Sequence, residues 1–381
     1  MDTPARAWDL FCHVVDNLGD IGVCWRLARQ LAREHRIEVR LWVDNLASFR
    51  SLCPALDPSA AVQRLGGVEV HRWSDSFPEM TPGAVVLEAF GCRLPASFVE
   101  AMARQERPPV WINLEHLSAE SWVEGCHGLP SPHPGLPLVT HFFFPGFGER
   151  TGGLLREADL LARRDAFAAD ARRVADFWGG IGVPPPAPGD ITVSLFGYPG
   201  APYARLFDAW SRGPVELRVI VPRSGVEAAL AGYFGSAAES PRPLRRGRLE
   251  VWPIAFLDQD HYDELLWACA VNFVRGEDSF VRAQWAAGAF VWQAYPQSDG
   301  AHLGKMEAFL TRYSAGLDPA AADALGALWR EWNAGGRPDA AWDDFLARLE
   351  PLVAHGRRWA ERLAHRDDLA KNLVAYTESL L

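Results

Sequence analysis

The stretch Asp16-Asn17-Leu18-Gly19-Asp20-Ile21-Gly22 decides how this chain is organised. It follows an apolar, strand-like run from Trp8 to Val15, and it opens a run from Val23 to His35 whose apolar residues recur at helical spacing. In an open α/β sheet, a turn from a strand into a helix lies at the carboxyl end of the strand, where such folds bind ligands. We therefore expect these two carboxylates to lie at a ligand-binding edge.

A second turn of the same style stands in the other half of the chain. Arg275-Gly276-Glu277-Asp278-Ser279 follows the apolar run Val271–Val274 and precedes another helical run. Backbone N–H groups at a helix start, beside a glycine, form an anion site suited to a pyrophosphate. Because one such turn stands in each half, we expect one active site shared between two domains.

Strands and helices alternate in both halves, and such alternation produces parallel sheets with right-handed crossovers. One long helix is expected over Ala158–Trp178. The dense prolines and glycines that follow cannot continue a helix or a central strand. We predict an N-terminal domain (1–180), a linker (181–189), a C-terminal domain (190–360) and a terminal helix (361–381) that can return to the first domain.

The composition sets limits on function. The chain has 381 residues, and its 38 basic and 48 acidic side chains give a net charge of −10, which argues against general nucleic-acid binding. No apolar run approaches the roughly 20 residues that span a bilayer. The first residues do not form a secretory signal, so we expect a cytoplasmic protein with no membrane partner.

The six cysteines do not indicate a metal site. None belongs to a C-x-x-C pair, and they stand in apolar surroundings or near segment ends, as small buried residues do in a reducing compartment. The chain also lacks an acidic D-x-D cluster beside the predicted phosphate site. We therefore expect no metal and no other cofactor.

The predicted fold class is α/β, with two doubly wound, Rossmann-like domains facing across a cleft and helices at the C-terminus. Many nucleotide-sugar glycosyltransferases have this layout, and so do some two-domain binding proteins and epimerases. The fold does not choose among these functions. The choice depends on the residues of the two turns.

The acidic turn offers a general base. Asp16 and Asp20 stand four residues apart, so one carboxylate can orient a nucleophile while the other accepts its proton. The structural alternative is that Asp20 only caps the first helix and Asp16 only ends the strand. His13, inside the preceding strand, is expected to be structural.

The second turn offers a binding site for a nucleotide sugar. Ser279 can donate a hydroxyl proton, while Glu277 and Asp278 are acceptors suited to sugar hydroxyls. Aromatic side chains at strand ends, Phe196 or Phe256, can stack on a base or wall a sugar pocket. Each of these residues also has a structural alternative. The turn residues can be solvated side chains at a capped helix start, and the aromatic residues can belong to the hydrophobic core.

Taken together, these motifs resemble the bacterial protein-arginine rhamnosyltransferases that modify translation elongation factor P. The run Phe11–Ala28 is similar to the opening signature of that family. Three later motifs match it in order and position: Leu195–Tyr198, Phe256–Gln259 and Arg275–Phe280. The resemblance extends over essentially the whole chain.

The resemblance implies an inverting enzyme of GT-B architecture. The donor is then dTDP-β-L-rhamnose, and the acceptor is an arginine side chain of elongation factor P. It implies that Asp20 is the base and that Asp16 and Asn17 position the acceptor. Glu277 joins Asp16 and Asp20 among the catalytic candidates. The implied donor-binding residues are Phe196, Tyr198, Phe256, Gln259, Glu277, Asp278 and Ser279.

Two alternatives remain open on the residues alone. Another GT-B transferase or a nucleotide-sugar epimerase would keep the donor site and change the acceptor. A non-catalytic protein that docks on a translation factor would form a complex without needing Asp20.

Overall fold

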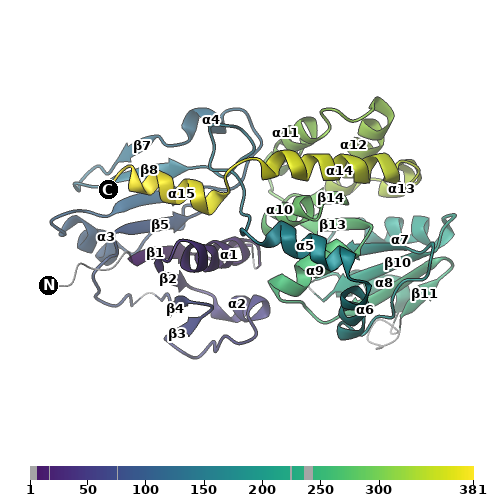
Figure 1. Cartoon of the computed structure of the whole chain (residues 1–381), viewed down its shortest axis with the longest axis horizontal. Helices are drawn as coiled ribbons and strands as arrows, with labels where there is room; N and C mark the ends of the chain where they lie inside the picture. Colours follow the sequence, from purple (N-terminus) through teal and green to yellow (C-terminus); the bar gives the residue numbers. More distant parts are fainter. Residues whose placement is uncertain (1–6, 17, 75, 224, 236–242) are drawn as a thin grey trace. The chain divides into compact units, whose positions relative to one another are not determined.

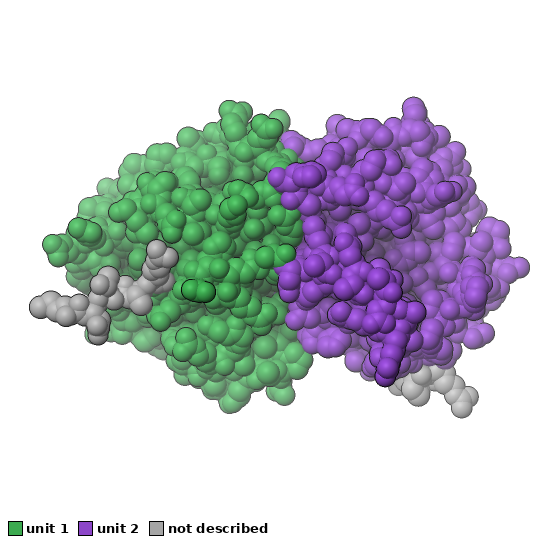
Figure 2. Space-filling model, viewed as in Figure 1, with its two compact units in different colours: residues 1–158, 366–381 green, residues 159–365 purple. Residues whose placement is uncertain are grey.

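The computed structural model describes residues 7–16, 18–74, 76–223, 225–235 and 243–381. The chain divides into two compact units, which Figure 2 colours separately. Unit 1 consists of residues 1–158 and 366–381, and unit 2 consists of residues 159–365. Each is built around one largely parallel sheet with helices on its faces, which confirms the predicted α/β class (Figure 1).

The sheet of unit 1 has the strand order β3-β4-β2-β1-β5-β6-β8-β7. The six inner strands pair in parallel, while β3 and β7 pair antiparallel at the two edges. The strands are β1 (Ala7–Cys12), β2 (Glu38–Val43), β3 (Val62–Leu65), β4 (Val68–Arg72), β5 (Val85–Ala89), β6 (Val110–Leu114), β7 (Pro130–Pro132) and β8 (Val139–Phe143). The helices are α1 (Gly19–Glu34), α2 (Leu46–Leu52), α3 (Ala96–Ala103), α4 (Val123–Cys126) and α15 (Leu369–Glu378).

The sheet of unit 2 has the order β11-β12-β10-β9-β13-β14, and only β11 pairs antiparallel. Its strands are β9 (Ile191–Leu195), β10 (Leu217–Pro222), β11 (Leu244–Arg246), β12 (Leu249–Ile254), β13 (Val271–Arg275) and β14 (Ala289–Gln293). Its helices are α5 (Leu160–Ala169), α6 (Ala171–Gly180), α7 (Tyr203–Arg212), α8 (Glu227–Phe234), α9 (Gln259–Ala268), α10 (Asp278–Trp285), α11 (Ala301–Tyr313), α12 (Pro319–Asn333), α13 (Pro338–Leu346) and α14 (Leu349–Ala364).

The central strands are buried on both faces, as their nearly continuous apolar sequences require. All residues of β5, β13 and β14 are buried. In unit 1 the ring of Phe11 stacks on Trp42 at 5.7 Å and meets Phe98 edge-on at 4.9 Å. In unit 2 the ring of Trp329 packs on Phe290 and Phe309. These cores hold the strand ends in fixed positions.

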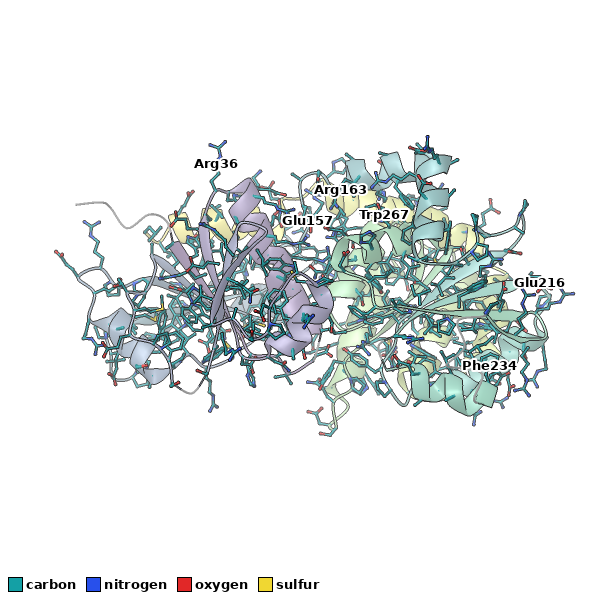
Figure 3. The ribbon with its side chains drawn as sticks, turned by 90° about the horizontal axis from the view of Figure 1, so that it is seen from below. Arg36, Glu157, Arg163, Glu216, Phe234 and Trp267 are labelled. Atoms are coloured by element: carbon teal, nitrogen blue, oxygen red, sulfur yellow. The ribbon has the colours of Figure 1, made fainter. Side chains whose placement is uncertain are left out.

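The predicted domain boundary was wrong. The segment 181–189 lies inside unit 2, and the units divide instead between residues 158 and 159 and between 365 and 366. The reason is that the helices before the prolines pack on unit 2. Phe167 meets the ring of Trp267 at 5.7 Å, and Arg173 forms an ion pair with Glu264 at 2.7 Å (Figure 3 labels Trp267). The prolines only connect α6 to β9.

The expected long helix over Ala158–Trp178 is two helices. Asp170 ends α5 and begins α6, and its carboxylate accepts hydrogen bonds from the N–H groups of Arg172 and Arg173. An aspartate at this position satisfies N–H groups that a new helix start leaves without intrahelical partners. Helical periodicity alone did not reveal this break.

The last helix, α15, belongs to unit 1. The hydroxyl of Tyr376 donates to the carbonyl of Gly128 at 3.1 Å and lies 3.0 Å from Nδ1 of His141. The backbone N–H of Leu369 donates to Leu154, and Gln30 of α1 donates to Asp368. Unit 1 is therefore completed by residues from the end of the chain.

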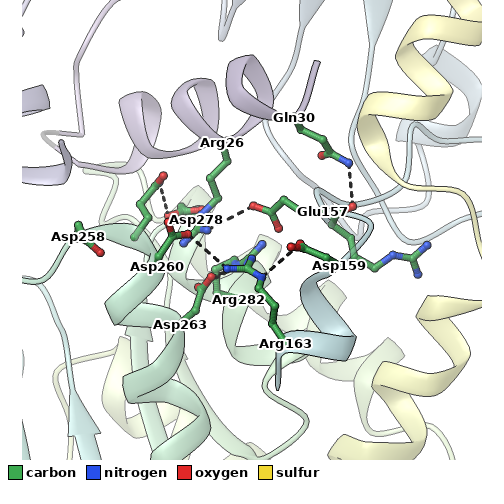
Figure 4. Close-up of polar contacts among 12 residues, drawn as sticks. Arg26, Gln30, Glu157, Asp159, Arg163, Asp258, Asp260, Asp263, Asp278 and Arg282 are labelled. Carbon is green, nitrogen blue, oxygen red and sulfur yellow. Dashed lines mark hydrogen bonds and ion pairs between the residues drawn. The ribbon is translucent and has the colours of Figure 1, made fainter. Parts of the chain in front are cut away.

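A buried ion pair joins α9 to α10. Arg282 and Asp263 are each 1% exposed, and two guanidinium nitrogens donate to the two carboxylate oxygens at 2.9 and 2.6 Å (Figure 4). Asp263→Ala leaves the guanidinium buried without this partner, so we expect the free energy of unfolding to fall by about 3–5 kcal/mol. Urea unfolding followed by tryptophan fluorescence measures the change.

The matched control is Glu307→Ala, which breaks the exposed Arg330–Glu307 pair. Exposed ion pairs contribute about 0–1 kcal/mol to the free energy of unfolding, so the stability of this variant should be close to that of the wild type. Equal decreases in the free energy of unfolding of the two variants would show that burial does not determine how much the Arg282–Asp263 pair stabilises the fold.

Candidate functional site

The acidic turn of unit 1 is organised by the carboxylate of Asp20. One oxygen of this carboxylate accepts hydrogen bonds from the backbone N–H groups of Val15 and Asp16, both at 2.9 Å. Asp20 lies in the first turn of α1, and the residue before that helix, Leu18, makes no side-chain capping bond. The carboxylate therefore binds the loop before the helix, which rules out the alternative that it only caps α1.

The backbone N–H of Asp16 donates to this carboxylate, and the Asp16 side chain lies against Gly19. A Cβ atom built on Gly19 would stand 2.5 Å from the Oδ2 atom of Asp16. The N–H of Gly19 also donates to the carbonyl of Asp16 at 2.7 Å, which closes the turn. The structure thus brings Asp16 and Asp20 together as predicted, while Asn17 lies outside the described residues.

The pKa of Asp20 is raised above the ordinary aspartate range. Burial is the main cause, because the side chain is only 7% exposed and a desolvated carboxylate loses favourable hydration. The two backbone hydrogen bonds and the imidazole of His116 act in the opposite direction, and the charge of Asp16 adds to the rise. A base with a raised pKa takes up a proton more readily than an exposed aspartate does.

Neighbouring strand ends add further polar groups to this edge. Asp44 follows β2, and its carboxylate accepts from the N–H of Val14 at 2.9 Å and contacts Nδ1 of His13 at 2.6 Å. His116 follows β6, and its ring stacks on Phe90, which follows β5, at 4.3 Å. The strand order β2-β1-β5-β6 explains why residues so distant in sequence share this edge.

The second turn lies at the carboxyl end of β13 in unit 2. The Arg275 side chain, 8% exposed, donates from Nη1 to the carbonyl of Gly197 at 2.9 Å. Its guanidinium lies over the rings of Phe196 and Tyr198, 4.3 and 4.7 Å from their centroids. The turn residues and the aromatic strand end of β9 are therefore one cluster.

The acidic residues of this turn lie at the start of α10, where side-chain and backbone hydrogen bonds fix the turn. Glu277 is the residue before α10, Asp278 is the first residue of that helix, and Asp278 accepts from Gln259 at 3.2 Å. The Ser279 hydroxyl accepts from the N–H of Arg275 and donates to its carbonyl. Gly276 adopts a positive φ of 61°, which a glycine tolerates without strain.

The predicted aromatic residues differ in their surroundings. Phe196 and Tyr198 are 7% and 6% exposed, and the Tyr198 N–H donates to the side chain of Gln293. Phe256 is half-buried between β12 and α9. The structure thus assembles Phe196, Tyr198, Gln259, Asp278 and Ser279 around Arg275 and α10. Their roles in donor binding stay predictions.

Sequence reasoning missed several members of both clusters. Asp44, His116 and Phe90 were not singled out because each stands alone after its own strand. The signal that could have found them was their common position at the carboxyl ends of β2, β6 and β5. Arg275 was quoted with its turn but given no role, although a cation ending an apolar strand is unusual enough to be noticed.

The described residues contain no group of three or more histidine, cysteine or acidic side chains placed to hold a metal ion. The six cysteines, all of which the structure describes, form no disulfide with one another. Among the described helices, none combines the length and the apolar character that crossing a bilayer requires.

Comparison with known proteins identifies the family of the chain. Residues 8–378 match the family model described as "Elongation-Factor P (EF-P) rhamnosyltransferase EarP". The chain belongs to this family. A curated relative from Pseudomonas putida, a protein-arginine rhamnosyltransferase, is 48% identical over 98% of the chain and 99% of its own length. The chain is therefore a protein-arginine rhamnosyltransferase.

Solved structures agree with this assignment. A structure from a study of EarP-mediated arginine glycosylation of translation elongation factor EF-P matches 98% of this chain and 99% of its own, with a TM-score of 0.70 and 36% identity. The glycosyltransferase VinC, solved in complex with dTDP, matches 98% of this chain and all of its own, with a TM-score of 0.51 and 11% identity. The second likeness concerns the fold alone, which is that of GT-B glycosyltransferases.

Gly19→Ala tests whether the position of Asp16 matters. The added methyl group displaces the Asp16 carboxylate, so we expect rhamnosyl transfer to fall by about tenfold to a hundredfold, on the scale of a misplaced active-site group. Thermal stability should hold, because alanine is a better helix former than glycine. Transfer assays and thermal melts report the two properties separately.

Gly232→Ala is the control. Position 232 also lies in a helix, and no atom stands within 4 Å of a Cβ built there. Its activity should equal that of the wild type. A fully active Gly19→Ala enzyme would mean that the arrangement of Asp16 is unimportant for transfer.

Proposed function

We propose that this enzyme transfers L-rhamnose from dTDP-β-L-rhamnose to an arginine side chain of elongation factor P, with inversion at the anomeric carbon. The observation that carries the proposal is the buried carboxylate of Asp20, held by two backbone N–H groups beside Asp16. The membership of the chain in the EarP family supports the donor and the acceptor.

The acceptor sets the chemical problem. A guanidinium has a pKa above about 12, so it is cationic and a poor nucleophile. Two adjacent carboxylates can overcome both the positive charge and the weak nucleophilicity. One carboxylate aligns the planar guanidinium group through paired hydrogen bonds, while the other accepts a proton. We assign proton acceptance to Asp20, and we assign alignment of the arginine to Asp16 and Asn17.

The bond changes form a single displacement. An arginine nitrogen attacks the anomeric carbon of rhamnose, and the bond from that carbon to the β-phosphate oxygen breaks. The nitrogen loses a proton to the Asp20 carboxylate, and dTDP departs with the bonding electron pair. Attack opposite the leaving group converts the β-linked sugar into an α-rhamnosyl arginine.

The donor belongs to unit 2 in this proposal. We assign the thymine to Phe196 and Phe256, and the nucleotide and sugar to Tyr198, Gln259, Glu277, Asp278 and Ser279. The start of α10 presents backbone N–H groups that lack intrahelical partners and a positive dipole end, which stabilise the charge of the departing diphosphate. The proposal includes no metal, so EDTA should leave the rate unchanged. With a translation factor as acceptor, the reaction takes place in the cytoplasm.

The deciding experiment incubates the enzyme with dTDP-β-L-rhamnose and purified elongation factor P, and then maps the modified peptide by mass spectrometry. We expect one deoxyhexose on one arginine. Donor hydrolysis without modification would favour another GT-B transferase or an epimerase. A stable complex without any mass change would favour a non-catalytic binding protein.

Two substitutions at Asp20 separate its chemistry from its structural contacts. Asparagine can still accept both backbone hydrogen bonds but cannot serve as the base, so Asp20→Asn should lower kcat/KM by about a hundredfold or more and keep the fold. Asp20→Ala should lose activity and also stability, by about 1–3 kcal/mol, because two backbone donors lose their acceptor. Transfer kinetics and thermal melts distinguish the variants.

The melting temperatures have an expected order. The folded-state pKa of Asp20 is raised, so its contribution to stability is complete below the unfolded pKa and is lost as the pH rises through the folded pKa. At neutral pH, Asp20→Asn removes a buried charge and should melt at or above the wild-type temperature. An active Asp20→Asn enzyme would eliminate Asp20 as the base.

The same pKa shift predicts the pH profile. A base must be ionised, so kcat/KM should fall as the pH decreases through the pKa of Asp20, at a pH above the ordinary aspartate range. The fall should be absent from the residual activity of Asp20→Asn. A profile that is flat down to the ordinary range would contradict the assignment.

Glu277→Ala tests the donor side. We expect weaker binding of dTDP-β-L-rhamnose and slower transfer, while binding of elongation factor P persists because we assign the acceptor to the turn of unit 1. Calorimetry with each substrate separately measures both affinities. Unchanged donor affinity and unchanged turnover would remove Glu277 from the site.

A further inference from the structure

Tyr262 is a buried tyrosine beside the second turn that has no part in the assignments above. It lies in the first half of α9 and is 9% exposed. Its ring packs against Phe196, with centroids 5.6 Å apart and planes inclined by 59°. The side chain is therefore fixed next to one of the aromatic residues that we assign to the thymine.

The hydroxyl of Tyr262 has no hydrogen-bond partner among the described residues. Other tyrosines of unit 2 have one: Tyr203 donates to the carbonyl of Tyr198 at 2.9 Å, and Tyr233 donates to Asp208 at 2.8 Å. A buried polar group left unsatisfied costs about 1–3 kcal/mol, so such groups are rare in native structures and call for an explanation. The explanation here lies in what surrounds the hydroxyl.

The hydroxyl lies near the start of α10. The Ser279 hydroxyl is close enough to lower the pKa of Tyr262, although the two hydroxyls do not meet the geometry of a hydrogen bond, and the charged groups around Tyr262 are Asp278, Arg275 and Asp263. Each of these already has a partner, since Ser279 is bonded to the backbone of Arg275, Asp278 to Gln259, and Asp263 to Arg282. Burial raises the pKa of Tyr262 well above its ordinary value, so the group remains a proton donor.

Two contacts prevent α9 from turning the hydroxyl away. Residues on either side of Tyr262 are tied to α10. Gln259 donates to Asp278, and Asp263 forms the buried ion pair with Arg282 that Figure 4 shows. The hydroxyl is thus a donor held ready beside a helix start that itself favours anions. A group held in this way needs no reordering when a ligand arrives.

We propose that the Tyr262 hydroxyl donates a hydrogen bond to the diphosphate of the bound nucleotide, beside the N-terminus of α10. The inference rests on the proposed function, because it takes the nucleotide sugar as the ligand of this turn. The free enzyme bears the cost of an unsatisfied hydroxyl, and the phosphate oxygen relieves that cost on binding. Tyr262 therefore increases the affinity for phosphorylated ligands at the expense of stability.

Tyr262→Phe tests the proposal, because it removes the oxygen and keeps the ring against Phe196. Calorimetry should show dTDP binding weakened by about tenfold to a hundredfold, the range for a hydrogen bond to a charged group. Thymidine, which lacks phosphate, should bind the variant and the wild type equally. The ligand-free variant should melt at or above the wild-type temperature, because it loses an unsatisfied buried hydroxyl.

A purely structural role predicts a different pattern: a lower melting temperature and unchanged dTDP affinity. Tyr233→Phe is the matched control, since it removes a satisfied hydroxyl; it should lose some stability and bind dTDP normally. If Tyr262→Phe binds dTDP as tightly as the wild type does, or loses thymidine affinity equally, the inference is wrong. If the wild type itself does not bind dTDP, the proposed donor is wrong instead.

Discussion

The acidic turn of unit 1 depends on one carboxylate bound to two successive backbone N–H groups. By accepting from Val15 and Asp16, Asp20 fixes the path of the chain between β1 and α1. The same contact partly offsets the desolvation of a charged group that the fold has buried. A carboxylate in this position serves two purposes, because it shapes the turn and retains one oxygen that the two bonds do not use.

The two turns have chemically different surroundings. The turn in unit 1 gathers carboxylates and is suited to a cation. The turn in unit 2 combines an arginine, aromatic rings and a helix start, which suits a flat base joined to an anion. The proposed function assigns the protein substrate to the first of these turns and the nucleotide to the second.

Much of the fold could be predicted from the sequence, because parallel strands buried on both faces appear as apolar runs. The sequence-based predictions failed where contacts between residues distant in sequence determine the structure. The prolines at 181–189 looked like a domain boundary, but the packing of Phe167 on Trp267 assigns the preceding helices to unit 2.

The acidic pair was found because its members are close in sequence. His116 and Asp44 were missed because only the order of the strands brings them to the same edge. Tyr262 was missed because an unsatisfied hydroxyl is a property of the surrounding atoms.

The return of α15 to unit 1 has a consequence for how the protein matures on the ribosome. Unit 2 is one continuous piece of chain and can condense as soon as it has left the exit tunnel. Most of unit 1 is made first, yet it receives Tyr376 and Leu369 only after the whole of unit 2 has been synthesised. The unit that carries the acidic turn therefore remains unfinished until unit 2 has been made, and a product truncated before residue 366 would contain all of unit 2 but an incomplete unit 1.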